Sequence, residues 1–146
     1  SAGHLTLSSA NIDDHPEIHP NYLSTDTDCR TIVKGIQIAR RIAQSEPLKS
    51  HITEEYAPGV GVALEDEVAT LEWARQTSVT IYHPTGTCKM GIDPMAVVDP
   101  SLKVKGIRGL RVADASIMPR IVSGNTNAPA IMIGEKASQL VLEDAS

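Results

Sequence analysis

Aromatic side chains are scarce in this sequence, whose 146 residues include no phenylalanine, one tryptophan and three tyrosines. The hydrophobic share is nevertheless 41%, an ordinary value for a soluble domain. A core must therefore be built mainly from isoleucine, valine, leucine, methionine and alanine. A chain of this length is long enough to bury one such core, but the low aromatic content leaves little material for an aromatic substrate pocket.

Basic charge, cysteine and long apolar runs are also lacking. The formal net charge of -5 argues against a nucleic-acid partner, because phosphate binding needs a surplus of Lys and Arg on one face. Two cysteines are too few for a disulfide framework. No apolar run approaches the roughly 20 residues of a membrane-spanning helix, and no signal-like segment opens the chain. We therefore expect no transmembrane segment and a cytoplasmic location.

Two pairs of residues have the side chains and spacing of possible metal ligands. His15 and His19 stand four apart, which would suit a metal site on a helix, but the prolines that follow each of them prevent a regular helix. His83 and Cys88 offer only two ligands, whereas a structural zinc site needs four. We predict that the chain holds no metal.

Apolar residues at helical spacing predict three helices. The first spans 26–44, with Ser24, Thr25 or Thr27 as its cap, acidic residues at its start and two arginines near its end. The second spans 65–76 and buries Val68, Leu71 and either Trp73 or Ala74. The third runs from about 128 to 143 with a proline in its first turn, where proline is tolerated.

The rest of the chain predicts strands and loops. Alternating leucines in 3–9 indicate a strand with one buried face, and the proline-rich stretch 11–22 is expected to be extended. The β-branched residues of 79–82 predict a strand that aims His83. Short strands are also expected in three segments separated by turns, 97–98, 102–104 and 110–112.

The strongest functional signal is a pair of motifs about forty residues apart, YHPTGTCKMG at 82–91 and SGNTNAP at 123–129. The first places His83 on a segment whose proline and glycines fix the shape of the backbone. An unperturbed histidine pKa of about 6.5 suits a side chain that accepts and returns protons near neutral pH. Taken alone, this histidine fits a structural role as well as a catalytic one.

The motif at 82–91, together with GLRVADASIMPRIVSGNTNAPAIMIGEKASQLV at 109–141, resembles the C-terminal signature of the glucose-methanol-choline (GMC) oxidoreductases, which are FAD-dependent alcohol oxidases and dehydrogenases. The resemblance implies an α+β fold. Residues 1–95 would form most of a substrate-binding domain, an antiparallel sheet with packing helices. Residues 96–146 would then supply the strand and helix that return to an FAD-binding domain, which is absent from this chain.

The resemblance also implies that a long upstream part is missing. GMC oxidoreductases are several times longer and begin with a G-x-G-x-x-G element that binds the FAD pyrophosphate. The nearest match, Gly59-Val60-Gly61, lacks the third glycine and follows Pro58 rather than a strand, so we expect a loop there. The chain would then depend on the N-terminal FAD-binding part of its own polypeptide. Alone, it would be inactive, retain no FAD and self-associate through uncovered apolar surface.

Residue by residue, the resemblance assigns catalytic roles to His83 and Asn127. His83 would take the proton of the substrate hydroxyl while hydride passes to flavin N5, and Asn127 would hydrogen-bond the substrate oxygen. The resemblance also implies that four residues contact FAD: Asp114, Ala115, Asn127 and Ala128. From the residues alone, Asp114 also fits an ordinary turn or cap, and Asn127 an ordinary helix N-cap.

The implied reaction is the oxidation of a primary alcohol, with choline as one candidate, to an aldehyde. The electrons would go to oxygen or to a membrane quinone, and in the second case the enzyme would sit at the periphery of the inner membrane. Two other classes stay open. One is a binding or assembly module that has kept the fold and lost the chemistry, and the other is a metal-dependent protein that uses its histidines.

Overall fold

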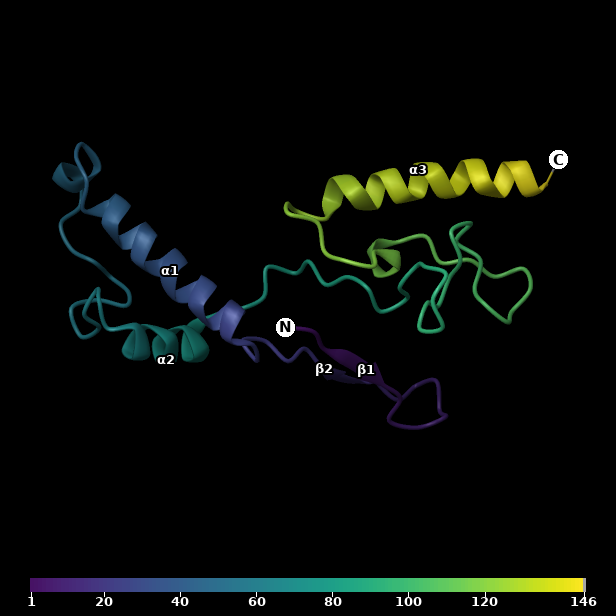
Figure 1. Cartoon of the computed structure of the whole chain (residues 1–146), viewed down its shortest axis with the longest axis horizontal. Helices are drawn as coiled ribbons and strands as arrows, with labels where there is room; N and C mark the ends of the chain where they lie inside the picture. The colour runs from purple at the N-terminus through teal and green to yellow at the C-terminus, as the bar shows by residue number, and fades with distance from the viewer. Residues whose placement is uncertain (146) are drawn as a thin grey trace. The chain divides into compact units, whose positions relative to one another are not determined.

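The chain forms two compact units, which divide between Val79 and Thr80. The structure is a computed structural model and describes residues 1–145. Within that range the fold is α+β, with one two-stranded antiparallel sheet and three α-helices. Figure 1 shows the elements, which follow in the order β1 (His4–Thr6), β2 (Glu17–His19), α1 (Asp26–Ala43), the 3-10 helix η1 (Leu48–His51), α2 (Glu67–Thr77), the 3-10 helix η2 (Ala115–Ile117) and α3 (Asn127–Asp144).

Helix α1 forms where the sequence predicts it and carries the expected capping. Thr25 is the N-cap, and its hydroxyl accepts a hydrogen bond from the Asp28 backbone N–H at 3.3 Å. Acidic residues lie in the first turn and arginines in the last, which complements the helix dipole. Val33 and Gln37, one helical turn apart, are buried, and the Gln37 amide donates to the Leu64 carbonyl at 3.1 Å. This polar side chain is therefore buried with a partner.

Helix α2 packs against α1 through a face of small residues. Asp66 is its N-cap and accepts a hydrogen bond from the Ala69 N–H at 2.9 Å, and Thr70 and Ala74 are fully buried. The prediction that Val68 is buried is wrong, because this side chain is 81% exposed. Val68 precedes Thr70 by two residues, which places it roughly 200° around the helix from the contact face.

Strands β1 and β2 form an antiparallel hairpin in which Leu5 pairs with Ile18. The strand predicted over 3–9 is thus confirmed in shortened form, and the extended stretch 11–22 supplies its partner. The prediction of one buried face is wrong, because every residue of both strands is exposed. Within the first unit no described helix contacts this sheet, so the helices of that unit leave both of its faces uncovered.

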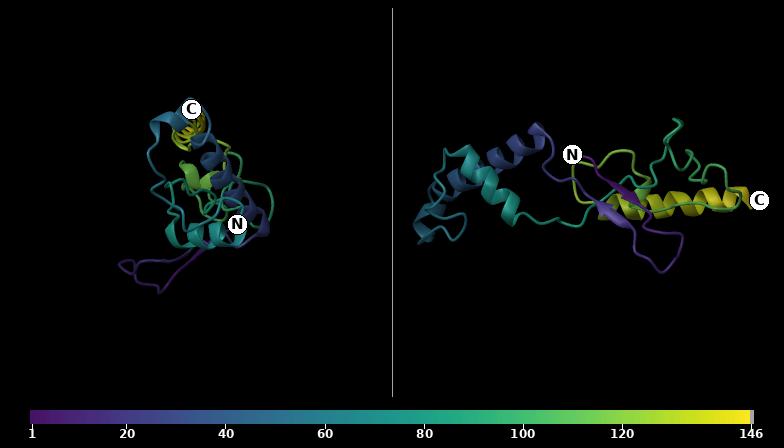
Figure 2. Two further views of the ribbon diagram at one scale, coloured as in Figure 1. Left: turned by 90° about the vertical axis from the view of Figure 1, so that its left-hand side faces the viewer. Right: turned by 90° about the horizontal axis from the view of Figure 1, so that it is seen from below.

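The second unit contains α3 and a segment with little secondary structure, both of which can be followed in Figure 2. One apolar cluster joins them. Ile133 and Ala137, one turn apart on α3, supply the helical side of the cluster. Val98, Leu102, Ile117 and Met118 supply the other side, and all four are buried.

Two basic residues of the same unit hold the C-terminal end of α3. Asp144 forms ion pairs with Lys103, at 2.5 Å, and with Arg111. The Arg111 guanidinium also donates to the Ser101 carbonyl. The hydrogen bond from Lys103 is the main cause of a lowered pKa at Asp144, so this carboxylate stays charged and paired down to acidic pH. The C-terminal end of α3 is therefore tied to the loop segment.

The strands predicted after residue 78 do not form as strands. Residues 79–82 have no ladder partner, and Tyr82 has a φ of 61°, a left-handed conformation that ends any strand. The segments within 97–112 form only isolated bridges among the described residues, Val98 with Met90 and with Val104, and Lys103 with Arg111. The larger antiparallel sheet is accordingly not found in the described residues. The predicted boundary between residues 95 and 96 separates a substrate-binding portion from a segment that returns to the FAD-binding domain. This division of functions stays a prediction.

The packing of the second unit predicts that truncating two nearby isoleucines of α3 will lower its stability by different amounts. Ile133 is 6% exposed within the apolar cluster, whereas Ile131 is 61% exposed. We expect Ile133→Ala to lower the free energy of unfolding by roughly 2–5 kcal/mol because it leaves a cavity. Ile131→Ala, the matched control, should change it by no more than about 0.5 kcal/mol. Chemical denaturation of the two variants compares these values, and equal losses would contradict the packing described for α3.

Candidate active site

The histidine motif at 82–91 is hydrogen-bonded to the segment that contains η2. The Cys88 N–H donates to the Ser116 carbonyl at 3.0 Å, and the Met90 N–H donates to the Ile117 carbonyl at 2.8 Å. Gly86 lies in the left-handed region, with a φ of 89°, and a Cβ there would come within 3.3 Å of the Met118 carbonyl oxygen. This close approach explains why glycine suits the centre of the motif.

His83 is half-buried and makes one specific side-chain contact. Its Nδ1 lies 2.8 Å from Oγ1 of Thr126, which is 8% exposed and is the N-cap residue of α3. The prediction that a strand aims this histidine is wrong. The chain instead turns at Tyr82, whose N–H donates to Oγ1 of Thr80 at 3.0 Å and whose left-handed backbone directs His83.

Asn127 and Ala128 are the first two residues of α3, and both are exposed. The alternative interpretation, in which Asn127 is an ordinary N-cap, is wrong by one residue, because the N-cap position is occupied by Thr126. Pro129 stands in the first turn, as expected. The N–H groups of Asn127 and Ala128 make no hydrogen bond among the described residues, so this helix end presents two free donors and the positive end of its dipole. The bond to Thr126 brings His83 to the same helix end as Asn127.

Asp114 and Ala115 begin η2. The Asp114 carboxylate accepts a hydrogen bond from the Ser116 N–H at 2.8 Å, and Asp114 is the N-cap of this 3-10 helix. The alternative reading of Asp114 as a cap residue is therefore confirmed, while its contact with FAD stays a prediction. Asp114 is exposed, and its second carboxylate oxygen is not engaged by the residues described. Ala115 is half-buried against the apolar cluster.

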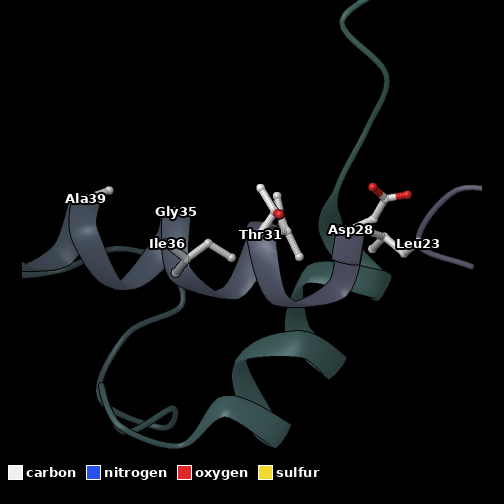
Figure 3. Close-up of a pocket in the computed structure, with 7 residues that line it drawn as sticks. Leu23, Asp28, Thr31, Gly35, Ile36 and Ala39 are labelled. Carbon is white, nitrogen blue, oxygen red and sulfur yellow. The ribbon is translucent and has the colours of Figure 1, made fainter. Parts of the chain in front are cut away.

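A shallow groove in the first unit contains none of the predicted site residues. It runs along α1 and is lined mainly by apolar and small residues, with one carboxylate, and Figure 3 shows it: Leu23, Asp28, Thr31, Ile32, Gly35, Ile36 and Ala39. All the residues predicted to act in catalysis or to contact FAD lie in the second unit.

Two further predictions concern metal ions and membranes. Within residues 1–145, no group of three or more His, Cys, Asp or Glu side chains is arranged to hold a metal ion, and Cys29 and Cys88 are both free thiols. In the same range no helix combines the length and apolar character needed to cross a bilayer.

Two residues near His83 do not follow from the sequence analysis. The motif pattern assigns no role to Thr126, and it predicts a strand end rather than a left-handed turn at Tyr82. A signal for Thr126 exists, because Pro129 follows it by three residues at the start of a helix. No sequence signal marks Tyr82, because a left-handed tyrosine is rare and depends on its surroundings.

A class of protein follows from comparison with known sequences. The sequence model described as GMC oxidoreductase, which represents the C-terminal domain of these enzymes, matches residues 1–134. The chain therefore belongs to the GMC oxidoreductase family, as its two motifs indicate.

Particular relatives and one solved structure agree with this assignment. The chain is 49% identical over 142 residues to alcohol dehydrogenase (acceptor) of Pseudomonas putida, covering 97% of this chain and 25% of that protein. It is 48% identical over 143 residues to mitochondrial choline dehydrogenase of Mus musculus, covering 97% and 24%. A formate oxidase of Aspergillus oryzae RIB40, studied for modification of its FAD, superposes with a TM-score of 0.90 at 29% identity, covering 98% and 25%. The chain thus spans about a quarter of the length of these proteins.

The contact beneath Gly86 can be tested against another left-handed glycine. Gly106 has a φ of 81°, similar to that of Gly86, but nothing lies within 4 Å of a Cβ built on it. Alanine at either position meets the left-handed penalty of about 1–2 kcal/mol, and only Gly86→Ala also presses on the Met118 carbonyl. We expect Gly86→Ala to lower the melting temperature more than Gly106→Ala. Equal shifts would show that the histidine motif is not packed tightly against the segment after η2.

Proposed function

We propose that this chain is the C-terminal quarter of an FAD-dependent alcohol oxidoreductase and that it contributes the proton-handling side of the active site. The observation that carries the proposal is the placement of His83 at the end of α3 that begins with Asn127. Membership of the GMC oxidoreductases and the names of its relatives support the same reading. By itself the chain is expected to be inactive, because the part that binds most of the cofactor would lie upstream.

The residues at the start of α3 suit a flavin. Two backbone N–H groups, of Asn127 and Ala128, are free of partners in the described part of the chain, and the helix dipole favours negative charge beside them. We assign these donors, together with Asp114 and Ala115, to the FAD contact. The FAD, when bound, supplies the acceptor for the hydride of the alcohol.

His83 is the group that moves a proton. A neutral imidazole with one ring nitrogen free accepts the hydroxyl proton of the alcohol, which makes the alcohol carbon a better hydride donor. Asn127 has a side-chain amide that donates to the substrate oxygen and does not titrate, so it orients the alcohol at any working pH. The half-burial of His83 limits the access of water to the same position.

The proposed substrate class is a primary alcohol, oxidised to an aldehyde. Alcohol and choline are the substrates in the names of the relatives with 49% and 48% identity, and choline is therefore one candidate. Recognition of its quaternary ammonium needs an aromatic or acidic cage. With aromatic residues at only 3% of this chain, we place most of that cage in the upstream part of the enzyme.

The roles of His83 and Asn127 predict the behaviour of two variants of the full-length enzyme. We expect His83→Ala to slow reduction of the bound flavin by the alcohol by about 10²–10⁴-fold, the usual contribution of a general base. We expect Asn127→Ala to slow it by roughly tenfold, because one hydrogen bond to the substrate is lost. Stopped-flow absorbance measures the rate, and the flavin content of the purified protein should stay unchanged.

Matched controls come from the same residue types. His51→Ala and Asn125→Ala alter exposed residues that carry no assigned role and should leave the reduction rate unchanged. If His83→Ala and Asn127→Ala also reduce flavin at the parental rate, the catalytic roles are refuted. The alternative function, a binding or assembly module derived from the same fold, would then be favoured.

The dependence on an upstream part predicts that the 146-residue chain does not retain FAD. The proposed FAD contacts of this chain are limited to the start of α3 and to η2, and the sequence has no G-x-G-x-x-G loop to bind the pyrophosphate. Gel filtration after mixing with FAD should therefore separate the flavin from the protein. The same run should show self-association, since apolar side chains such as Leu5 and Ile18 are exposed. Co-elution of flavin with the protein would contradict the proposed dependence.

A further inference from the structure

The N-cap of α3 differs from those of the other two helices. In α1 and α2 the cap side chain accepts a hydrogen bond from the N–H of the third helical residue, Asp28 or Ala69. In α3 the third helical residue is Pro129, which has no N–H. Thr126 also has helical backbone angles, with a φ of -83° and a ψ of -2°, whereas the N-cap Thr25 of α1 is extended. The Thr126 side chain makes no capping bond. Its hydroxyl is left available for another partner.

That partner is His83. Thr126 is 8% exposed, so its hydroxyl needs a protein partner, and Nδ1 of His83 lies 2.8 Å from it. The backbone carbonyl of Thr126 is already used by the Ala130 N–H at 2.9 Å. The residue is thus fixed by the helix on its main-chain side while its side chain points to the imidazole.

We propose that Thr126 is a positioning residue, whose hydroxyl oxygen accepts the Nδ1–H of His83 and thereby keeps Nε2 as the basic nitrogen. This inference rests on the proposed function, in which His83 accepts a proton. It assigns Thr126 a role that neither catalysis by Asn127 nor capping of α3 requires.

The direction of this hydrogen bond follows from the proton transfer. The O–H bond of the alcohol breaks and an Nε2–H bond forms, so His83 becomes an imidazolium with a proton on each ring nitrogen. A threonine oxygen that accepts from Nδ1–H serves both the neutral and the charged ring. A hydroxyl that donated to Nδ1 would instead force the proton of the neutral ring onto Nε2, where it would block the transfer. Such a bond would also have to break when the ring became charged.

The tautomer of His83 tests this proposal without any reaction. The full-length enzyme, labelled with ¹⁵N-histidine and loaded with FAD, is studied by NMR at about pH 8, above the ordinary histidine pKa of about 6.5. The His83 signals are identified by their loss in His83→Asn. We expect the ring proton on Nδ1 in the parent and in Thr126→Ser, and its redistribution toward Nε2 in Thr126→Val. A proton on Nε2 in the parent enzyme overturns the proposal, whatever the variants do.

Kinetics give the second readout. We expect Thr126→Val to slow flavin reduction at saturating alcohol by about tenfold, the value of one hydrogen bond to a group that becomes charged. Thr126→Ser, which keeps the hydroxyl, should restore most of the rate. Thr53→Val, at an exposed threonine of the first unit, should have no effect. A slow Thr126→Ser variant, or a Thr126→Val variant with parental rate, would contradict the positioning role.

The failure of this inference can be told apart from failure of the proposed function. If His83→Ala keeps the parental rate, the catalytic role of His83 falls, and the positioning role falls with it. If His83→Ala is slow while Thr126→Val keeps both the parental rate and the Nδ1 proton, the function stands and only the role of Thr126 is rejected.

Discussion

Packing of α3 onto a loop segment is the constraint on which the candidate site depends. Ile133 and Ala137 insert among buried residues of the loops, and the ion pairs of Asp144 hold the far end of the helix. The loop segment has only isolated bridges and scattered main-chain hydrogen bonds in place of a ladder, so packing against α3 contributes to fixing its path. With α3 fixed, its N-cap residue Thr126 has a defined place beside His83.

The same arrangement explains how residues distant in sequence share one site. The histidine motif is bound through main-chain hydrogen bonds to the segment containing η2, and η2 in turn contacts α3. Two kinds of contact therefore place His83, the main-chain hydrogen bonds of Cys88 and Met90 within its motif and the contact of its own side chain with Thr126. Such double support suits the proton transfer proposed for His83, because small errors in the position of a catalytic group are costly to a reaction.

Much of the fold could be predicted from local pattern, and the errors have one physical origin. Helices α1, α2 and α3 follow from apolar spacing, capping residues and charge at their ends, all local properties. Val68, the strand at 79–82 and the buried face of β1 were predicted wrongly. Burial and strand pairing depend on which surfaces meet, and that is a property of distant parts of the chain.

The sequence by itself determined the family, the helices and the identity of the residues around the candidate site, including a proline that removes a donor from the start of α3. Its motifs also marked His83 and Asn127. Only the tertiary structure decided that the freed hydroxyl of Thr126 meets Nδ1 of His83, and that Tyr82 adopts a left-handed turn before it. The physical reason is that a motif specifies side chains and local turns, whereas a contact across 43 positions arises from packing of the whole unit.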